Sequence, residues 1–361
     1  MTRGDKVVPV DKPERILIIR PSALGDVCRS VPIAAAIKKH RPNSEIHWLV
    51  NAPYAQVIEA HPAVSRIIPF DRKALGAQMK RLNFRPILRF LRSLRQEKYE
   101  IVIDAQGLAR SGFFAFSTGA RTRIGHADAR ELGWLGLNRR VPPEPDQHTV
   151  DRMMALLKPL GISEPTPDMR LYSRPTDAEW VNADAELKKP YLAIAPTSIW
   201  PGKRWPIERF VELAQRLTGD GHRLVVLGAP GEEAYCTPLL ELASLGLPII
   251  DRVGSTTTGQ MLAIIERAQA VVANDSAAVH MAVGFDRPFV GLLGATHPLI
   301  FGPYRRSRDI IQHARPGEWQ SFKHTEVASE LMTRITVDEV HSRVQSILAS
   351  GGAGSSQIPV S

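Results

Sequence analysis

The chain has 361 residues, of which 43% are hydrophobic, and its formal net charge is +9. This length predicts two domains, and the positive charge favours anionic partners such as phosphorylated ligands, nucleic acid or an acidic membrane surface. Cys28 and Cys236 are the only cysteines, so we expect no disulfide framework and a reducing compartment. The polar start lacks the apolar run of a signal peptide, and no stretch reaches the about 18 apolar residues of a spanning helix. We therefore expect a protein that is soluble or bound to a membrane surface.

Short apolar strands alternate with helical patterns along the chain. In the first half we expect strands at 16–19, 46–50, 66–69 and 101–104, and helices at 27–39, 55–59 and 86–96. In the second half we expect strands at 191–195, 223–227, 249–251, 270–273 and 289–293, and helices at 207–217, 232–245, 258–267 and 277–283. This alternation predicts an α/β fold with two successive doubly wound units, each a parallel sheet covered on both faces.

The boundary between the units falls in 161–190, which contains four prolines and no strong periodicity and is therefore predicted to be a connector. We predict a first domain over 1–170 and a second over 171–349. The second domain should end in one amphipathic helix over 332–348. The small polar residues of 350–361 predict a disordered tail.

A polar loop containing Asp26 follows the first predicted strand, with Gly25 directly before the carboxylate. The loop joins a strand to a helix, which places it at the carboxyl edge of a parallel sheet, where ligands of such folds bind. Asp26 can act there as a base, or it can cap the helix. The loop alone leaves both interpretations open.

Hydroxyl and ammonium donors follow the strand at 191–195. Thr197, Ser198 and Lys203 precede Pro206, a favourable first residue for a helix. These side chains suit a phosphate, with lysine as a flexible point charge. The alternative is a solvated loop with tryptophans packed beneath it.

A second polar loop follows the strand at 270–273. Asp275 and Ser276 open a helix, and His280 lies one turn further on. The N–H groups at such a helix start bind anions. Alternatively, Asp275 or Ser276 caps the helix and His280 faces the core. A carboxylate repels phosphate, so Asp275 is better suited to Lys203 or to a sugar hydroxyl.

Glu232 lies beyond the tip of the strand at 223–227, where an acidic residue can accept hydrogen bonds from a ribose; a first-turn glutamate is the alternative. Gly-x-Gly-x-x-Gly follows none of the predicted strands, which argues against a nicotinamide cofactor. Neither a CxxC pair nor a His/Cys cluster with zinc spacing occurs, so no metal is expected.

The segment from Arg72 to Lys98 contains nine lysines or arginines and one acidic residue, Glu97. Three arginines at positions 85, 89 and 92 share one face of the predicted helix at 86–96. This face can meet phosphates on a lipid or nucleic acid, or it can simply be solvated. Few aromatic residues are interleaved, which argues against single-stranded nucleic acid.

Several of these segments together resemble glycosyltransferase family 9, the ADP-heptose heptosyltransferases of lipopolysaccharide core synthesis. Five motifs occur in the family's order between about residues 16 and 304. They are Ser22-Ala-Leu-Gly-Asp26, Asp104-Ala-Gln-Gly-Leu108, Lys203-Arg-Trp-Pro206, Asn274-Asp-Ser-Ala-Ala-Val-His280 and the loop 291–298. The second is similar to the segment typical of the heptosyltransferase I branch.

The resemblance implies a GT-B architecture, in which two Rossmann-like domains, the acceptor domain first and the nucleotide-sugar domain second, face each other across a cleft. It implies inverting transfer without a metal or other cofactor, with Asp26 as general base and Lys203 neutralising the diphosphate leaving group. Donor contacts are implied at Thr197, Ser198, Glu232, Asp275, Ser276, Ala277 and His280. Acceptor contacts are implied at Ser22, Gly25 and Gln106, and cations for an acidic acceptor at Arg72, Lys73 and Arg110.

One residue departs from the family pattern. The family usually has glycine after the Ser or Thr of the second donor motif, and this chain has Ala277. Alanine keeps the N–H donor but restricts close backbone approach and positive φ. The departure therefore bears on the fit and identity of the donor.

The resemblance also implies ADP-heptose as co-substrate, an acidic Kdo-lipid A type acceptor and a place at the cytoplasmic face of the inner membrane, with no nucleic-acid partner. Two alternatives remain open. One keeps the fold and changes the acceptor to another glycan or a protein side chain. The other is a non-catalytic nucleotide- or nucleic-acid-binding protein.

Overall fold

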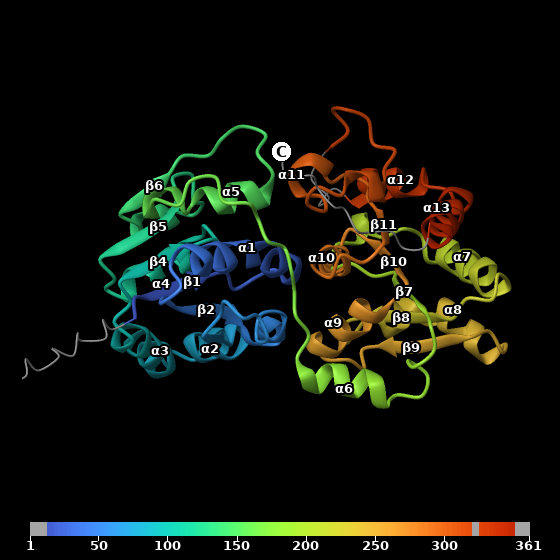
Figure 1. Cartoon of the computed structure of the whole chain (residues 1–361), viewed down its shortest axis with the longest axis horizontal. Helices are drawn as coiled ribbons and strands as arrows, with labels where there is room; N and C mark the ends of the chain where they lie inside the picture. Colours follow the sequence, from blue (N-terminus) through green and yellow to red (C-terminus); the bar gives the residue numbers. More distant parts are fainter. Residues whose placement is uncertain (1–12, 320–324, 351–361) are drawn as a thin grey trace, which may run out of the picture.

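The computed structural model describes residues 13–319 and 325–350. The chain forms two parallel six-stranded sheets, one from each half, that stand side by side (Figure 1). The first sheet has the order β3-β2-β1-β4-β5-β6. Its strands are β1 Arg15–Ile19, β2 Glu45–Asn51, β3 Arg66–Phe70, β4 Ile101–Asp104, β5 Thr122–His126 and β6 Arg139–Val141.

The second sheet repeats this topology. Its order, β12-β11-β10-β7-β8-β9, is the same winding counted from β7. Its strands are β7 Leu192–Ala195, β8 Leu224–Gly228, β9 Ile249–Val253, β10 Ala270–Asn274, β11 Phe289–Leu292 and β12 Ile310–Ile311. In each half the order reverses between the first strand and the fourth, and doubly wound sheets bind their ligands at that crevice.

Helices cover both faces of the two sheets (Figure 1). The first half contains α1 Leu24–His40, η1 Ala52–Val57, α2 Arg72–Lys80, α3 Arg85–Gln96, α4 Ala109–Ser117, η2 Gly133–Gly136, α5 Thr149–Ala155 and η3 Lys158–Leu160, where η marks a 3-10 helix. The second half contains α6 Pro175–Ala183, η4 Pro201–Lys203, α7 Ile207–Gly219, α8 Glu233–Ser244, α9 Thr258–Arg267, α10 Ala277–Gly284, α11 Pro298–Phe301, η5 Ser307–Asp309, α12 Thr325–Thr333 and α13 Val337–Ala349.

The central strands are buried on both faces. In β1 the residues Ile16 to Ile19 are fully buried and alternate between two apolar clusters, as the two-residue period of a strand requires. One of these clusters continues across the boundary between the halves, because α1 packs against α10. The apolar contact between these two helices fixes the distance between the loops at their N-termini.

The α/β architecture predicted from the alternation is confirmed, and the nine predicted strands are present. The predicted helix at 55–59 is a 3-10 helix at 52–57 instead. Three strands, β5, β6 and β12, escaped prediction because they are short and contain glycine, arginine or only two residues.

The predicted connector at 161–190 contains a helix that was not predicted from the sequence. This helix is α6, which packs on α9 of the second half. The final helix predicted at 332–348 is present as α13, but it begins only at Val337, and the predicted start belongs to the end of a separate helix, α12. Thr336 starts α13 by accepting a hydrogen bond from the Glu339 N–H at 3.3 Å.

The domain limits at 170 and 349 stay predictions, and the predicted tail, apart from Ser350, lies outside the described residues. Among the described helices, none combines the length and apolar character that a membrane crossing requires.

Candidate active site between the two sheets

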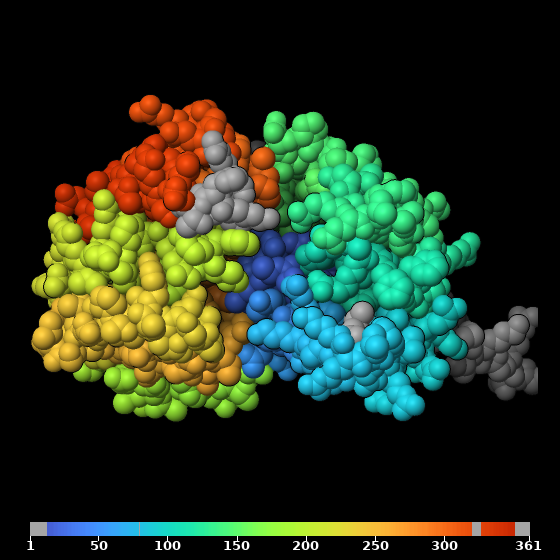
Figure 2. Space-filling view, turned by 180° about the vertical axis from the view of Figure 1, so that it is seen from behind, coloured from blue at the N-terminus to red at the C-terminus, as the bar shows by residue number. Residues whose placement is uncertain are grey.

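A cavity of about 1220 Å³ lies between the two halves, and both halves line it. The loops after β1 and β4 contribute Asp26 and Gln106, and the loops after β7 and β10 contribute Lys203 and Asp275. Figure 2 shows this groove from behind, with blue residues of the N-terminal segment at its bottom. The cavity therefore joins the two crevices at which the strand orders reverse.

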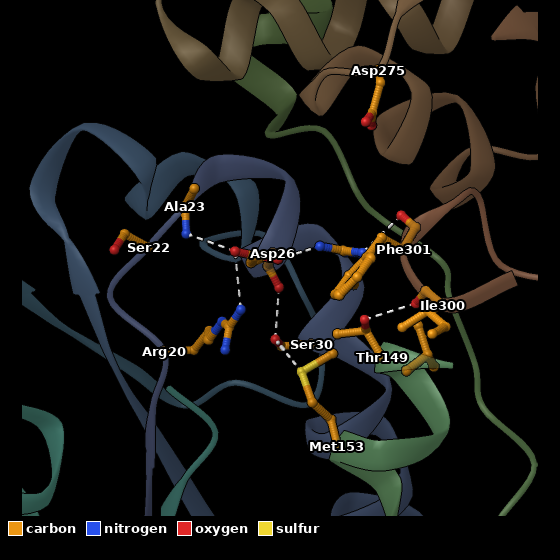
Figure 3. A network of polar contacts seen from close by, with 12 residues as sticks. Arg20, Ser22, Ala23, Asp26, Ser30, Thr149, Met153, Asp275, Ile300 and Phe301 are labelled. Atoms are coloured by element: carbon orange, nitrogen blue, oxygen red, sulfur yellow. Dashed lines mark hydrogen bonds and ion pairs between the residues drawn. The ribbon is translucent and has the colours of Figure 1, made fainter. Parts of the chain in front are cut away.

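Asp26 occupies the first turn of α1 and faces this cavity (Figure 3). Its Oδ2 accepts a hydrogen bond from the Ala23 N–H at 3.1 Å and pairs with Arg20 Nη2 at 3.0 Å. Its Oδ1 pairs with Arg29, one turn along α1. The capping interpretation is thus confirmed, and because the same carboxylate lines the cavity, its role as a base stays a prediction.

The two arginines control the charge of this carboxylate. Burial by itself would raise the pKa of Asp26, but the positive charges of Arg20 and Arg29 outweigh it and hold the pKa well below its usual range. Asp26 is therefore ionised at neutral pH. A carboxylate with so low a pKa is a weak proton acceptor.

The loop after β4 is organised around a second, fully buried carboxylate. Asp104 Oδ1 accepts hydrogen bonds from the Gln106 N–H at 2.9 Å and the Gly107 N–H at 3.0 Å, and Ser111 donates to Oδ2 at 2.9 Å. Burial raises the pKa of Asp104 to about 6, although these hydrogen bonds by themselves would lower it. Gln106 Oε1 in turn accepts from the Ser22 N–H at 3.1 Å, so Asp104 indirectly positions the loop of Asp26.

On the opposite wall, Lys203 and Asp275 form a largely buried ion pair. Lys203 Nζ lies 2.6 Å from Asp275 Oδ2, and the Thr296 hydroxyl donates to the same oxygen at 2.5 Å. Burial would raise the pKa of Asp275, but Lys203 outweighs it and lowers the pKa. In Figure 3 the Asp275 carboxylate points from the second half toward the loop of Asp26.

Asn274 fixes the backbone around this pair. The side chain is fully buried, its Oδ1 accepts from the Trp205 N–H at 3.0 Å, and its Nδ2 donates to the Pro196 carbonyl at 2.6 Å. The loop after β7 is therefore tied at both of its ends to the end of β10. Lys203 lies between these two ties and is held opposite Asp275.

The first turn of α10 meets α1 across the cavity. His280 is buried but lines the cavity, and burial, with help from the Arg29 charge, lowers its pKa to about 3, so the ring is neutral. Ser276 lines the cavity as the residue before the helix, without a side-chain capping bond. Ala277 begins α10 and is not among the described residues with positive φ, so its backbone conformation does not require glycine, and its effect on the fit of the donor stays a prediction.

The other predicted donor contacts also reach the cavity. Thr197 and Ser198 are buried at its wall. Glu232 lines it too, while its Oε2 accepts from the Ala229 N–H at 2.7 Å. Glu232 is thus the residue before α8 and not a residue of its first turn, which begins with Glu233, and it borders the cavity.

The predicted acceptor residues divide into two groups. Gly25 and Gln106 line the cavity, whereas Ser22 does not line it but donates its N–H to Gln106. Arg72, Lys73 and Arg110 do not line it. Arg110 lies over the Phe70 ring at 5.7 Å, and burial, together with the charge of Arg72, lowers its pKa. These cations gather at the end of β3, outside the cavity.

Several cavity residues were missed from the sequence. They are Arg20, Arg29, His126 and Arg152. For Arg20 and Arg29 a signal existed, because one follows the predicted strand before the loop and the other lies three residues beyond Asp26 on a helix. The other two come from β5 and α5, and only folding brings them to the cleft.

Among the described residues, no group of three or more His, Cys, Asp or Glu side chains is placed to hold a metal ion. The two cysteines are buried, one in each half. The charged groups that line the cavity are instead arginines, a lysine and single carboxylates.

Comparison with known proteins agrees with this geometry. The model of glycosyltransferase family 9 (heptosyltransferase) matches residues 87–331. The lipopolysaccharide heptosyltransferase 1 of Pseudomonas aeruginosa is 31% identical over 81% of this chain and 82% of that protein. The lipopolysaccharide core heptosyltransferase OpsX of Haemophilus influenzae is 22% identical over 93% of this chain and 98% of that protein.

Solved structures show the same architecture. The Escherichia coli heptosyltransferase WaaC, solved with ADP, has a TM-score of 0.72 at 25% identity and covers 92% of this chain and 99% of its own. The Escherichia coli ADP-heptose lipopolysaccharide heptosyltransferase II has a TM-score of 0.77 at 22% identity, over 94% and 100% of the two chains. The fold is therefore GT-B, as expected, and the chain is a glycosyltransferase that belongs to family 9, the heptosyltransferases.

Proposed function

We propose that this enzyme transfers heptose from ADP-heptose to an acidic, Kdo-lipid A type acceptor in lipopolysaccharide core synthesis, with inversion and without a metal or other cofactor. The observation that carries this proposal is the position of Asp26 opposite the Lys203–Asp275 pair across one cavity. The names of the similar heptosyltransferases support the choice of donor and acceptor.

In the proposed reaction, the acceptor hydroxyl oxygen forms a bond to the anomeric carbon while the bond from that carbon to the diphosphate oxygen breaks. The hydroxyl proton passes to the Asp26 carboxylate, and Lys203 offsets the charge that develops on the departing ADP. Attack from the wall of the first half and departure toward the second half would place the two groups on opposite faces of the sugar. That arrangement supports inversion.

The donor would lie against the second half. Thr197, Ser198 and the start of α10 at Ser276 and Ala277 would contact its phosphates through hydroxyls and N–H groups. Glu232 would accept from the ribose, and His280 would contact the donor as a neutral ring. A lysine already serves as the cation at the diphosphate, which supports a mechanism that needs no metal.

The acceptor would lie against the first half. Ser22, Gly25 and Gln106 would border the reacting hydroxyl, and Arg72, Lys73 and Arg110 at the rim would meet the acidic groups further along the acceptor. This division fits an acceptor that is longer than the cavity.

Asp26→Asn tests the reaction. The variant should bind ADP within about twofold of the wild-type affinity by calorimetry, but should transfer sugar at least about 100-fold more slowly. Retention of full turnover would exclude Asp26 as the base. Calorimetry with ADP, UDP, GDP and NAD tests the donor, and preferential binding of UDP or NAD would remove the assignment. Mass analysis of products from a panel of glycan and protein acceptors tests the acceptor.

We also propose that the first half binds the cytoplasmic face of an anionic membrane. The nine lysines and arginines between Arg72 and Lys98 are all exposed. Seven large apolar side chains in the same region are also exposed, namely Leu82, Phe84, Leu88, Phe113, Phe116, Leu132 and Leu135. Helices α3 and α4 pack side by side. In Figure 2, light-blue to teal residues of this region lie on the side of the molecule on which the groove is open.

Exposed cations beside exposed apolar side chains suit the headgroups and the acyl boundary of an anionic bilayer. The test is flotation with anionic and zwitterionic vesicles at low and high salt. The double variant Arg85→Gln/Arg89→Gln should lose binding to anionic vesicles, whereas Lys188→Gln/Lys189→Gln, which removes exposed charges from the second half, should not. Equal binding by both double variants would exclude this surface.

A further inference from the structure

Arg29 contacts both halves of the molecule at once. From α1, its Nη2 pairs with Asp26, and its Nη1 donates to the Phe301 carbonyl at the end of α11 at 2.9 Å. The side chain is 10% exposed, and its Nε has no hydrogen-bond partner among the described residues. The guanidinium is therefore held in place by these two contacts.

Phe301, the partner of Arg29 in the second half, belongs to the side of the cavity against which the donor is proposed to lie. The helix α11 follows directly on the loop of Thr296, whose hydroxyl donates to Asp275. Gln312 Nε2 anchors that loop by donating to the carbonyls of Gly294 at 2.7 Å and Thr296 at 2.8 Å. A displacement of α11 would thus be transmitted to Asp275, which pairs with Lys203.

Two neighbouring carbonyls of the same segment also accept from the first half. Thr149 donates to the Ile300 carbonyl at 2.8 Å, and His148 Nε2 lies 3.1 Å from the Gly302 carbonyl. Figure 3 shows Thr149 and Ile300 facing each other, with Phe301 on the same segment beside Asp26. Of the three links, that of Arg29 is the one that also contacts the proposed base.

We propose that Arg29 is a positioning residue that couples the approach of the two halves to the charge and placement of Asp26. In the arrangement seen here, the planar guanidinium is shared between the carboxylate and the Phe301 carbonyl. If the second half turned away, the bond to Phe301 would break and both N–H groups could turn to Asp26, which would hold the proton less readily. The proposal rests on the role proposed above for Asp26.

Two variants at position 29 separate the positive charge of the side chain from its ability to span both contacts. Lysine at position 29 keeps a positive charge beside Asp26, but it is a single point charge and cannot span both contacts as a guanidinium does. Glutamine removes the charge. With Arg29→Lys we expect kcat to fall about tenfold or more, because Asp26 is displaced. The Kd for ADP should stay within about twofold, because the bonds from Thr149 and Gln312 still hold α11 and the loop of Thr296 in place.

The effect of the residue at position 29 on the ionisation of Asp26 can be measured without an activity assay. A carboxyl ¹³C titration, assigned with Asp26→Asn, should show the pKa of Asp26 about one unit or more higher in Arg29→Gln than in Arg29→Lys. Thr149→Val serves as the control, because it removes a neighbouring link between the halves and leaves both arginine pairs of Asp26 intact. It should not move the pKa of Asp26.

Three results would overturn the proposal. They are wild-type kcat in Arg29→Lys, a parallel fall in kcat, ADP affinity and melting temperature, or the same pKa for Asp26 in both variants. A failure of the proposed function is distinguishable, since Asp26→Asn would then retain turnover whatever the behaviour of the Arg29 variants.

Discussion

Gly25 of α1 lies directly against His280 of α10, across the boundary between the two halves. A Cβ at position 25 would lie 2.8 Å from His280 Cδ2 and 3.5 Å from the Ala277 Cα. The buried ring cannot turn away as an exposed side chain would. The absence of a side chain at Gly25 therefore sets how closely the loop of Asp26 approaches the start of α10.

Gly25→Ala should push the two helix starts apart and displace Asp26 from the donor wall. We expect kcat to fall by about 100-fold, because a displacement of about 1 Å at a reacting group has an effect of that size. Gly76→Ala is the matched control, since a Cβ there meets nothing within 4 Å and alanine favours the helix α2. Steady-state kinetics with saturating donor decide the matter, and equal kcat in both variants would contradict the prediction.

Lys203→Ala should weaken ADP binding by about 10- to 100-fold, because a charge-assisted contact is lost. It should also destabilise the protein, since the buried Asp275 carboxylate loses the cation that lowers its pKa. The double variant Lys203→Ala/Asp275→Asn removes that uncompensated charge. Its melting temperature should recover while its ADP affinity should not, and recovery of both would argue against a direct role of Lys203 at the donor.

Asn274→Ala leaves the Trp205 N–H and the Pro196 carbonyl without their buried partner. Each unpaired group costs about 1–3 kcal/mol, so we expect a lower free energy of unfolding in urea. The ADP affinity should also fall, because the loop that carries Lys203 is released. Asn182→Ala removes an exposed asparagine from α6 and should change neither quantity.

Asp104 should give the free energy of unfolding a distinct pH dependence. Its pKa is raised in the folded state, from 3.8 to about 6, so the folded protein binds more protons than the unfolded chain between these values. Stability contributed by this group is therefore complete below about pH 4 and lost as the pH rises to about 6, a loss of about 3 kcal/mol.

Asp104→Asn should remove this contribution, so the difference in unfolding free energy between variant and wild type should change between pH 4 and pH 7. Urea titrations at both pH values measure it. A constant difference would show that Asp104 is ionised throughout this range. The two N–H groups of the loop can still bond to the asparagine oxygen, so the variant should fold.

Much of the fold could be read from the sequence because its determinants are local. Continuous apolar runs such as Ile16 to Ile19 mark buried parallel strands, and the polar loops after them mark the ligand edge. The helix α6 was missed because prolines on either side suggested a connector, although Pro175 is the first residue of that helix. At the C-terminus, the predicted amphipathic pattern extends over the end of α12 and the whole of α13, and Thr336 marks the start of the second helix as its N-cap.

The site residues that could be predicted are those for which a single loop after a strand supplies the signal. Asp26, Lys203 and Asp275 each follow a strand, and all three reach the same cavity. The rim cations Arg72, Lys73 and Arg110 lie outside it, since the end of β3 is displaced from the crevice between β1 and β4. For Ala277, only the structure shows that the backbone does not adopt the positive φ that favours glycine.

By itself, the sequence determined the two doubly wound sheets and the polar residues at their edges, because strand periodicity and strand-to-helix turns are properties of neighbouring residues. The tertiary structure decided which of these residues act together. The clamp of Asp26 by Arg20 and Arg29, the contact of Gly25 with His280 and the bond from Arg29 to Phe301 depend on how two halves pack. Residues 272 positions apart meet there, and no local pattern encodes a contact at that separation.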